Sequence, residues 1–324
     1  MRRILASALL VFFAAIGVSG ARAASEYPSQ PIHLVVAYPP GTATDLAARQ
    51  IVPKLAQLLG TEVIVDNRGG AGGIVGTQAV ARAAPDGYTL LFATGQTQAI
   101  NLSLYAHLPY DPVKDFTPVA RVAQTPMVLV VPPSLGVHSV DELITLAKSK
   151  PGTLNFASSG AGSSAHLSGA LLGSEAGLSI THTPYTSAAQ AFSDLMNGDV
   201  SLMFYPYLPL SPLIQAGKLV PLATTAAERP TYLQKVPTMT EAGFKDFLVV
   251  PWFGIYGPAG LPKPIVDKIA AAVDQTLKDP DTQKRLLAVG TDPDFGGPDT
   301  LAQFTRDEIA RYRKFVALSG AKVE

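Results

Sequence analysis

Four short loops in this sequence combine glycines with hydroxyl side chains and contain few groups that titrate near neutral pH. They cover residues 38–44, 66–73, 94–98 and 158–164. Glycine adopts positive φ at little cost, and a helix that begins at a hydroxyl residue leaves its first backbone N–H groups free to attract an anion. These residue types therefore favour binding of an oxyanion through main-chain and hydroxyl donors.

Catalysis by a serine nucleophile is not favoured. A serine hydrolase needs a Gly-x-Ser-x-Gly elbow, and the sequence contains none. Ser163 and Ser164 stand only two or three residues before His166, so they do not face it across a helix. The five histidines show no metal-ligand spacing, and no pair of carboxylates stands out as an acid/base couple. Of the histidines, His166 is the one that we expect to face a cleft.

Dinucleotide chemistry is not favoured either. The glycines of residues 70–76 follow the pattern G-x-G-x-x-x-G, and no acidic residue stands near the end of the next strand. A glycine-rich loop that holds an oxyanion is compatible with this segment. One helix N-terminus contributes about 0.3 to 2 kcal/mol to a bound anion, and a hydrogen bond to a charged group about 1.5 to 3 kcal/mol. A micromolar ligand needs only about 8 kcal/mol, so anion capture is possible without arginine.

The loops must be positioned by strands that alternate with helices. Hydrophobic periodicity predicts strands at 32–37, 62–65, 88–93, 127–131, 153–157, 180–184 and 200–204, and helices at 45–59, 74–84, 139–148, 165–172, 188–197, 265–277 and 301–318. Such alternation indicates an α/β fold with mixed, mostly parallel sheets covered on both faces, in which ligands bind outside the carboxyl ends of the strands. Residues 101–125 are less regular, and we expect the last two helices to lie on the outside of a lobe.

The strand-loop-helix arrangement of the first part of the chain is built again after residue 125. No residue-level repeat accompanies it, so the pattern predicts two similar lobes. We expect residues 24–124 and 251–324 to form lobe 1 and residues 125–250 to form lobe 2. The two connecting segments would act as a hinge beside a cleft between the lobes.

The N-terminus has the features of a cleavable export signal. A basic start, an apolar run over residues 4–18 and an Ala-x-Ala ending predict residues 1–23 as a signal peptide cut after Ala23. Removing its three arginines leaves 22 basic against 25 acidic residues, a net charge of −3, which argues against nucleic acid and anionic membranes as partners. With no cysteine, the chain has no lipid-modified cysteine and no thiolate metal site. We expect a periplasmic protein.

Motifs along nearly the whole mature chain resemble those of the extracytoplasmic solute receptors of tripartite tricarboxylate transporters, the Bug family. The segments that carry the resemblance are YPPG at 38–41 with Asp45, Ala48 and Arg49; DNR at 66–68 with GAGG at 70–73; PDGYTL at 85–90; SSG at 158–160 with Gly162, Ser163, His166 and Leu167; PY at 184–185; PT at 237–238 with EAG at 241–243; and WFG at 252–254 with PAG at 258–260. The number and order of these motifs make the resemblance specific.

The resemblance implies a two-lobed, type II-like periplasmic binding fold with a carboxylate in the cleft between the lobes. It also implies delivery of that ligand to an inner-membrane permease of two further proteins. Family sites correspond to residues 40–45, 70–73 and 158–164 of this chain, with much of the contact made through backbone and ordered water. A component that presents its ligand to a sensor is an open alternative with the same cleft, and a periplasmic hydrolase is a weaker one.

Three positions depart from the family pattern. Thr42 replaces the second glycine after the prolines, Thr186-Ser187 replace Lys-Gly, and Tyr205 stands where an acidic residue is frequent. We hypothesise that losing this acid disfavours a ligand amine and that Tyr205, Tyr207 and Phe253 line an apolar or aromatic wall. Alternatively, the two tyrosines only pack beside neighbouring prolines.

The candidate site therefore binds a small organic anion, with no cofactor, no metal and no catalysis. We expect a monomer that uses the following residues: Tyr38, Pro40, Gly41, Thr42, Thr44, Asp45, Gly70, Ala71, Gly72, Gly73, Thr94, Gln96, Ser158, Ser159, Gly160, Ser163, Ser164, His166, Tyr185 and Tyr205.

Overall fold

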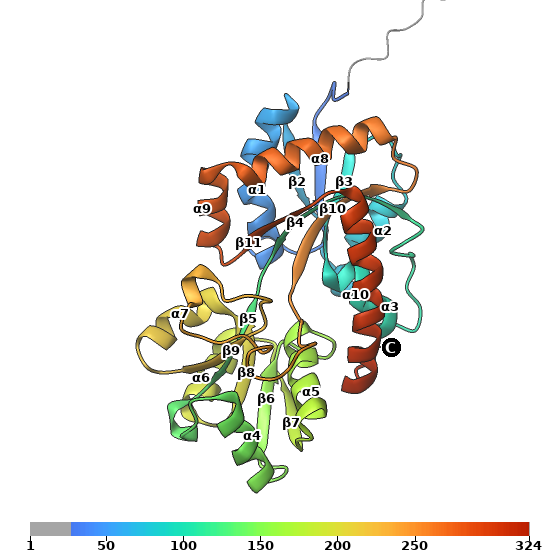
Figure 1. The fold of residues 1–324 in the computed structure, drawn as a ribbon. Coiled ribbons are helices and arrows are strands. Elements are labelled where there is room, and N and C mark those ends of the chain that lie inside the picture. Colours follow the sequence, from blue (N-terminus) through green and yellow to red (C-terminus); the bar gives the residue numbers. More distant parts are fainter. Residues whose placement is uncertain (1–26, 324) are drawn as a thin grey trace, which may run out of the picture.

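The computed structural model describes residues 27–323, so the predicted signal peptide lies outside the described residues. Two mixed sheets form the centres of two lobes, joined by the chain between β4 and β5 and again before β10 (Figure 1). Within residues 27–323 no helix has the length and apolarity needed to cross a membrane.

The sheet of the first lobe has six strands in the order β11-β4-β10-β3-β1-β2. They are β1 (Ile32–Val36), β2 (Val63–Asn67), β3 (Thr89–Thr94), β4 (Phe116–Gln124), β10 (Trp252–Pro258) and β11 (Asp292–Gly296). β1 pairs in parallel with β2 and β3, while β10 is antiparallel to β3 and β4. Alternate strand residues face opposite sides: Leu34 packs with α1 (Ala43–Leu59) and α8 (Lys263–Lys278), and Val35 packs with α2 (Ile74–Ala81).

The sheet of the second lobe has five strands in the order β7-β6-β8-β5-β9. They are β5 (Met127–Val131), β6 (Leu154–Ser158), β7 (Ile180–Pro184), β8 (Leu202–Pro206) and β9 (Val220–Thr224), with helices α4 (Val140–Ser149), α5 (Ser164–Ala176), α6 (Ala188–Asn197) and α7 (Tyr207–Gln215). Leu129 faces the core that contains α4 and α5, and Val128 faces the core that contains α6. The remaining helical segments of the described chain are η1 (Ala71–Gly73), η2 (Gln96–Ile100), α3 (Asn101–Leu104), η3 (Pro133–Leu135), η4 (Thr231–Leu233), α9 (Pro280–Ala288) and α10 (Pro298–Ser319).

The predicted strands and helices are confirmed within a few residues, and β5, β7 and α6 have the predicted bounds. The less regular stretch 101–125 instead contains α3 and the long strand β4, whose Pro118 weakens the strand pattern. The sequence pattern also missed α7, β9, β10, α9 and β11. The predicted α/β fold with mixed sheets is confirmed. The antiparallel pairs come from β10, which enters the first sheet from the other lobe and pairs with β3 and β4, and from β5, which pairs with β8 and β9.

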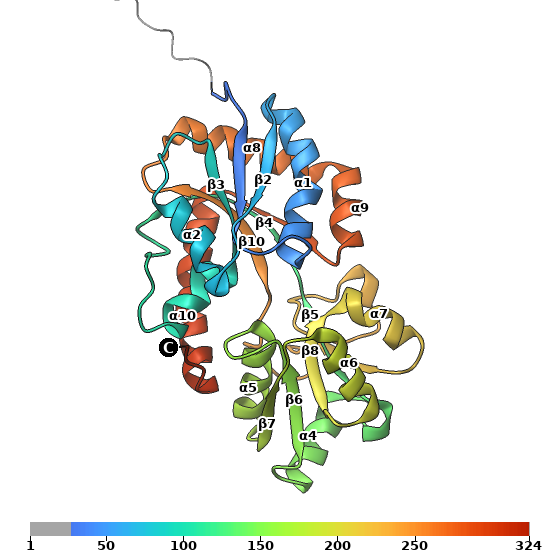
Figure 2. The ribbon, with the colours of Figure 1, turned by 180° about the vertical axis from the view of Figure 1, so that it is seen from behind.

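Helix α10 was expected on the outside of a lobe, and this expectation is wrong. The helix has 22 residues, a length of about 33 Å. Leu301 packs under the first sheet, whereas Tyr312, Phe315 and Val316 join the core of the second lobe. Its C-terminal half lies beside α5 in both views (Figures 1 and 2). The last helix of the chain is therefore placed to reach a site between the lobes.

Candidate functional site

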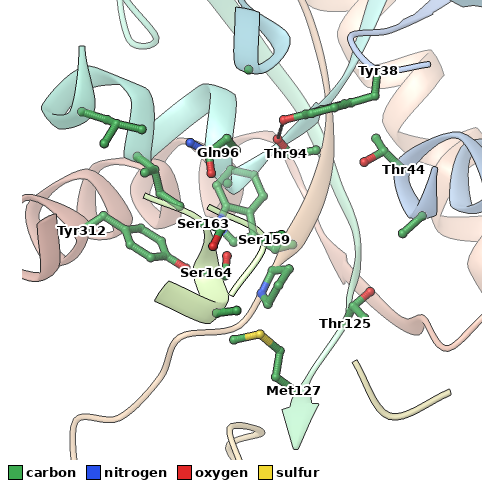
Figure 3. A pocket seen from close by; sticks show the side chains of 18 of the residues that line it. Tyr38, Thr44, Thr94, Gln96, Thr125, Met127, Ser159, Ser163, Ser164 and Tyr312 are labelled. Atoms are coloured by element: carbon green, nitrogen blue, oxygen red, sulfur yellow. Dashed lines mark hydrogen bonds between the residues drawn. The ribbon is translucent and has the colours of Figure 1, made fainter. Parts of the chain in front are cut away.

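A cavity of about 450 Å³ lies between the two lobes, next to the loops that follow β1, β3 and β6 (Figure 3). Its volume falls in the range of small-molecule sites. Among the described residues that line it, there is no Asp, Glu, Lys, Arg or His. Any charge on a ligand must therefore be stabilised here by neutral donors.

The N-terminus of α1 forms one side of the cavity. Two prolines end β1 and Gly41 takes φ 82°, so the chain turns sharply before the helix begins at Ala43. Thr42 caps the helix by accepting a hydrogen bond from the N–H of Asp45, and its hydroxyl donates to Pro39 O at 2.9 Å. Ala43 and Thr44, in the first turn, line the cavity.

Asp45 supports this loop from behind and does not line the cavity. Its carboxylate accepts from Gly41 N, Arg49 Nε and Asn67 Nδ2, each at 2.9 Å, and the residue is 2% exposed. Burial alone would raise the pKa of Asp45, but the hydrogen bonds from Arg49, Gly41 and Asn67 together lower it below its ordinary value. The loop is thus held by an ionised network outside the cavity.

The N-terminus of α5 contributes from the second lobe. Gly160 and Gly162 take φ of 113° and 73°, and Ser163 caps the helix by accepting from His166 N at 3.2 Å. The Ser163 hydroxyl donates to Gly160 O at 2.8 Å, which closes the turn. Ser163, Ser164 and Ala165 line the cavity.

His166 lies beneath this loop rather than in the cavity, so the expectation that it faces the cleft is wrong. Its Nδ1 accepts from Gly162 N at 3.1 Å, and its ring stacks on His182 with centroids 3.9 Å apart. Burial and the neighbouring His182 lower the pKa of His166 to about 4, so the ring is neutral at pH 7. His182 Nε2 in turn shares a hydrogen bond of 2.6 Å with Ser158 Oγ. Ser158 is fully buried, so this pair is not an accessible nucleophile.

The loops after β2 and β3 meet at a third side of the cavity. Gln96 Nε2 donates to Asn101 Oδ1 at 2.7 Å, and Asn101 Nδ2 donates to Gly72 O at 3.2 Å. The hydroxyls of Tyr38 and Thr94 share a hydrogen bond of 3.1 Å. These bonds fix Gly72, Gln96 and the strand ends relative to one another.

Several hydroxyls in the cavity lining have no partner among residues 27–323. Those of Thr44, Ser159 and Ser164 make no hydrogen bond there, and neither do the phenol groups of Tyr105, Tyr205 and Tyr312. Unpaired hydroxyls beside two helix N-termini are suited to a ligand that accepts hydrogen bonds.

Most of the remaining lining is apolar or aromatic, and most of it was not predicted. The side chains missed by sequence reasoning include those of Ile100, Leu104, Tyr105, Thr125, Met127, Trp252, Tyr312 and Val323. Tyr205 and Phe253 line the cavity, whereas Tyr207 stacks on Tyr232 with centroids 5.4 Å apart. The Trp252 indole N–H donates to Glu308 Oε2 at 3.0 Å, and burial raises the pKa of Glu308 to about 7.

The structure places the twenty predicted site residues in two groups. Those that line the cavity are Tyr38, Thr44, Gly72, Thr94, Gln96, Ser159, Ser163, Ser164 and Tyr205. Those that do not line it are Pro40, Gly41, Thr42, Asp45, Gly70, Ala71, Gly73, Ser158, Gly160, His166 and Tyr185. Of the second group, Ser158, Gly160 and Tyr185 line an adjoining hollow of about 440 Å³ in the second lobe, which shares Ser159 and Tyr205 with the central cavity. Glycine and proline in the second group shape the loops, because their backbone turns present the neighbouring residues.

Comparisons with known proteins agree with this geometry. Residues 47–320 match the family model described as tripartite tricarboxylate transporter family receptor. The chain is 36% identical to BugT of Bordetella pertussis over 325 residues, which cover 100% of this chain and 99% of BugT. It is 35% identical to the R. palustris protein Rpa4515, solved with adipate, with a TM-score of 0.79 over 92% of this chain and 100% of that one. It is 33% identical to MatC from Rhodopseudomonas palustris, solved with bound malate, with a TM-score of 0.74 over 90% and 100% of the two chains.

Proposed function

Because the chain belongs to the tripartite tricarboxylate transporter receptor family, we propose that its central cavity binds a small carboxylate between the N-termini of α1 and α5. The observation that carries this proposal is the convergence of these two first turns, with the free hydroxyls of Thr44, Ser159 and Ser164, on one cavity without charged side chains. Two helix N-termini and a few charge-assisted hydrogen bonds reach the roughly 8 kcal/mol of a micromolar complex. No bond-breaking group is needed.

The ligand class follows from the lining. An aromatic wall that includes Tyr205 and Phe253 suits an apolar or aromatic body, and no carboxylate among the lining residues is available to pair with an ammonium group. Adipate and malate, bound by two relatives, carry no amine. We therefore propose a carboxylate without an amino group.

We propose that residues 24–124 and 251–324 move as lobe 1 and residues 125–250 as lobe 2. A hydrogen bond of 2.7 Å from Thr125 N to Pro251 O ties the two connecting segments together, which supports their acting as a single hinge. Trp252, the one tryptophan of the sequence, stands at this hinge and lines the cavity. Its fluorescence should therefore change when a ligand binds.

The biological setting is part of the same proposal. The mature protein, cut after Ala23, acts as a monomer in the periplasm and delivers its ligand to a permease of two subunits. N-terminal sequencing of the exported protein and co-purification with membrane fractions test these two points.

Binding is tested by isothermal titration with adipate, malate, benzoate and glutamate. We expect saturable binding of at least one of the first three and weaker binding of glutamate. Thr44→Glu, which places a carboxylate at the N-terminus of α1, should reduce affinity at least about 100-fold through like-charge repulsion. Thr300→Glu is the matched control, because Thr300 is an exposed residue in the first turn of α10 and does not line the cavity. Equal effects of both variants, or no binding of any probe, would contradict the proposal.

A further inference from the structure

Tyr312 combines deep burial with an unpaired hydroxyl. The residue is 1% exposed, and its ring packs edge-on against Phe315 with centroids 5.8 Å apart. Within residues 27–323 its hydroxyl has no hydrogen-bond partner. Other buried tyrosines are satisfied: Tyr256 shares a hydrogen bond of 2.7 Å with Thr305 Oγ1, and Tyr110 donates to Thr97 O at 2.7 Å. The hydroxyl oxygen is not one of the fully buried unpaired atoms of the described residues, so the ring is buried while its hydroxyl stays open to the cavity and free to bind a ligand.

The unpaired hydroxyl opens on the central cavity. Tyr312 lines it, and Figure 3 shows the side chain reaching in from α10 with its oxygen toward Ser164. Helix α10 packs against α5, so Tyr312 and the first turn of α5 belong to neighbouring elements. The backbone N–H of Val323 donates to Leu104 O at 3.0 Å, which fixes the chain beyond α10 at the same cavity.

The hydroxyl keeps its proton and can therefore donate it to an anion. Burial and the neighbouring Glu308 raise the pKa of Tyr312 well above its ordinary value, so the phenol stays protonated. A neutral donor adds to the helix N-terminus and the serine hydroxyls without introducing a charge.

We propose that Tyr312 is a ligand-binding residue whose hydroxyl donates a hydrogen bond to the carboxylate held at the N-terminus of α5. This rests on the proposed function, because it requires an anion in the central cavity. This assigns a binding role to α10, whereas the sequence motifs indicate binding only by loops. The ligand would then be held by α10 as well as by loops of both lobes.

The test removes single hydroxyl groups. Tyr312→Phe should weaken binding of adipate, malate or benzoate about tenfold or more, since a hydrogen bond to a charged group is lost. It should leave the melting temperature of the ligand-free protein unchanged, because no bond within the protein is removed. Tyr256→Phe is the matched control: it removes a buried bond to Thr305, so it should lower the melting temperature and leave affinity unchanged.

The outcomes separate this inference from the proposed function. If the wild-type protein and Tyr312→Phe bound a probe with equal affinity, the proposed role of Tyr312 would be overturned and the proposed function would stand. A lower melting temperature of ligand-free Tyr312→Phe, with unchanged affinity, would assign the hydroxyl a purely structural role and overturn it too. Failure of the wild-type protein to bind any of the three probes would overturn both.

Discussion

The loops before α1 and α5 present the same feature to the cavity and are supported in different ways. Each turns on glycine with positive φ, Gly41 in the first loop and Gly160 and Gly162 in the second, and ends in a capped helix whose first turn lines the cavity. Behind the first loop lies an ionised network of Asp45, Arg49 and Asn67. Behind the second lie two stacked neutral rings, His166 and His182. The comparison teaches that one binding geometry can be held by charge in one lobe and by neutral groups in the other.

The two supports respond differently to acid. The pKa of Asp45 is lowered in the fold, so its stabilising effect is present above the ordinary aspartate pKa and is lost only when the pH falls through the lower folded value. The pKa of His166 is lowered from 6.5 to about 4, so its contribution is full above pH 6.5 and is lost as the pH falls toward 4. Between pH 6.5 and 4, of these two supports only the one behind the second-lobe loop should lose stabilising free energy.

The largest effect is expected from breaking the charged support. Asp45→Ala removes a buried carboxylate that accepts three hydrogen bonds, and it should lower the free energy of unfolding by about 3 kcal/mol. Urea denaturation measures this change. Asp141→Ala, at an exposed first-turn aspartate of α4, is the control and should cost far less. If both variants lost the same free energy of unfolding, the loss at Asp45 would reflect only its position at a helix N-terminus, and the proposed role of its hydrogen-bond network would be contradicted.

The neutral support is tested by pH. His166→Asn keeps an acceptor for Gly162 N but does not titrate, so the variant should lack the part of the stability loss, roughly 2 kcal/mol, that His166 causes between pH 6.5 and 4. Burial raises the pKa of Glu308 from 4.5 to about 7, which lowers stability as the pH rises through that window. The measurement is therefore the difference between wild type and variant at each pH. His138→Asn, at an exposed histidine, is the control, and an unchanged profile in His166→Asn would contradict the account.

The smallest effect is expected from removing the N-cap hydroxyls of α1 and α5. Ser163→Ala and Thr42→Ala should each cost about 1 kcal/mol of unfolding free energy. The loss should be larger at Ser163, because its hydroxyl bond to His166 N is 3.2 Å against 3.5 Å at Thr42. Ser163 lines the cavity and Thr42 does not, so only Ser163→Ala should also weaken carboxylate binding in calorimetry. If Thr42→Ala weakened carboxylate binding more than Ser163→Ala, the loop before α1 would contribute more to binding than the loop before α5, which would contradict this prediction.

Local patterns were enough to predict the loops but not what faces the cavity. Prolines, Gly41 and the apolar spacing of α1 are short-range signals, and they located the first loop correctly. The inward or outward orientation of His166 depends on stacking with His182, sixteen positions away in another element. Tyr312 reaches the site only because α10 crosses to the second lobe, which no spacing within the helix encodes. β11, with the sequence DPDFG, is a strand set by pairing with β4 rather than by propensity.

The central claim is that oriented backbone N–H groups from both lobes hold the ligand carboxylate. Amide chemical shifts in a titration with adipate, malate or benzoate test it most directly. We expect saturating downfield shifts of the amide protons of Thr44 and Ser164, with those of Val140 and Asp141 at the N-terminus of α4 unchanged. Saturable binding that leaves the Thr44 and Ser164 amides unmoved would contradict the account.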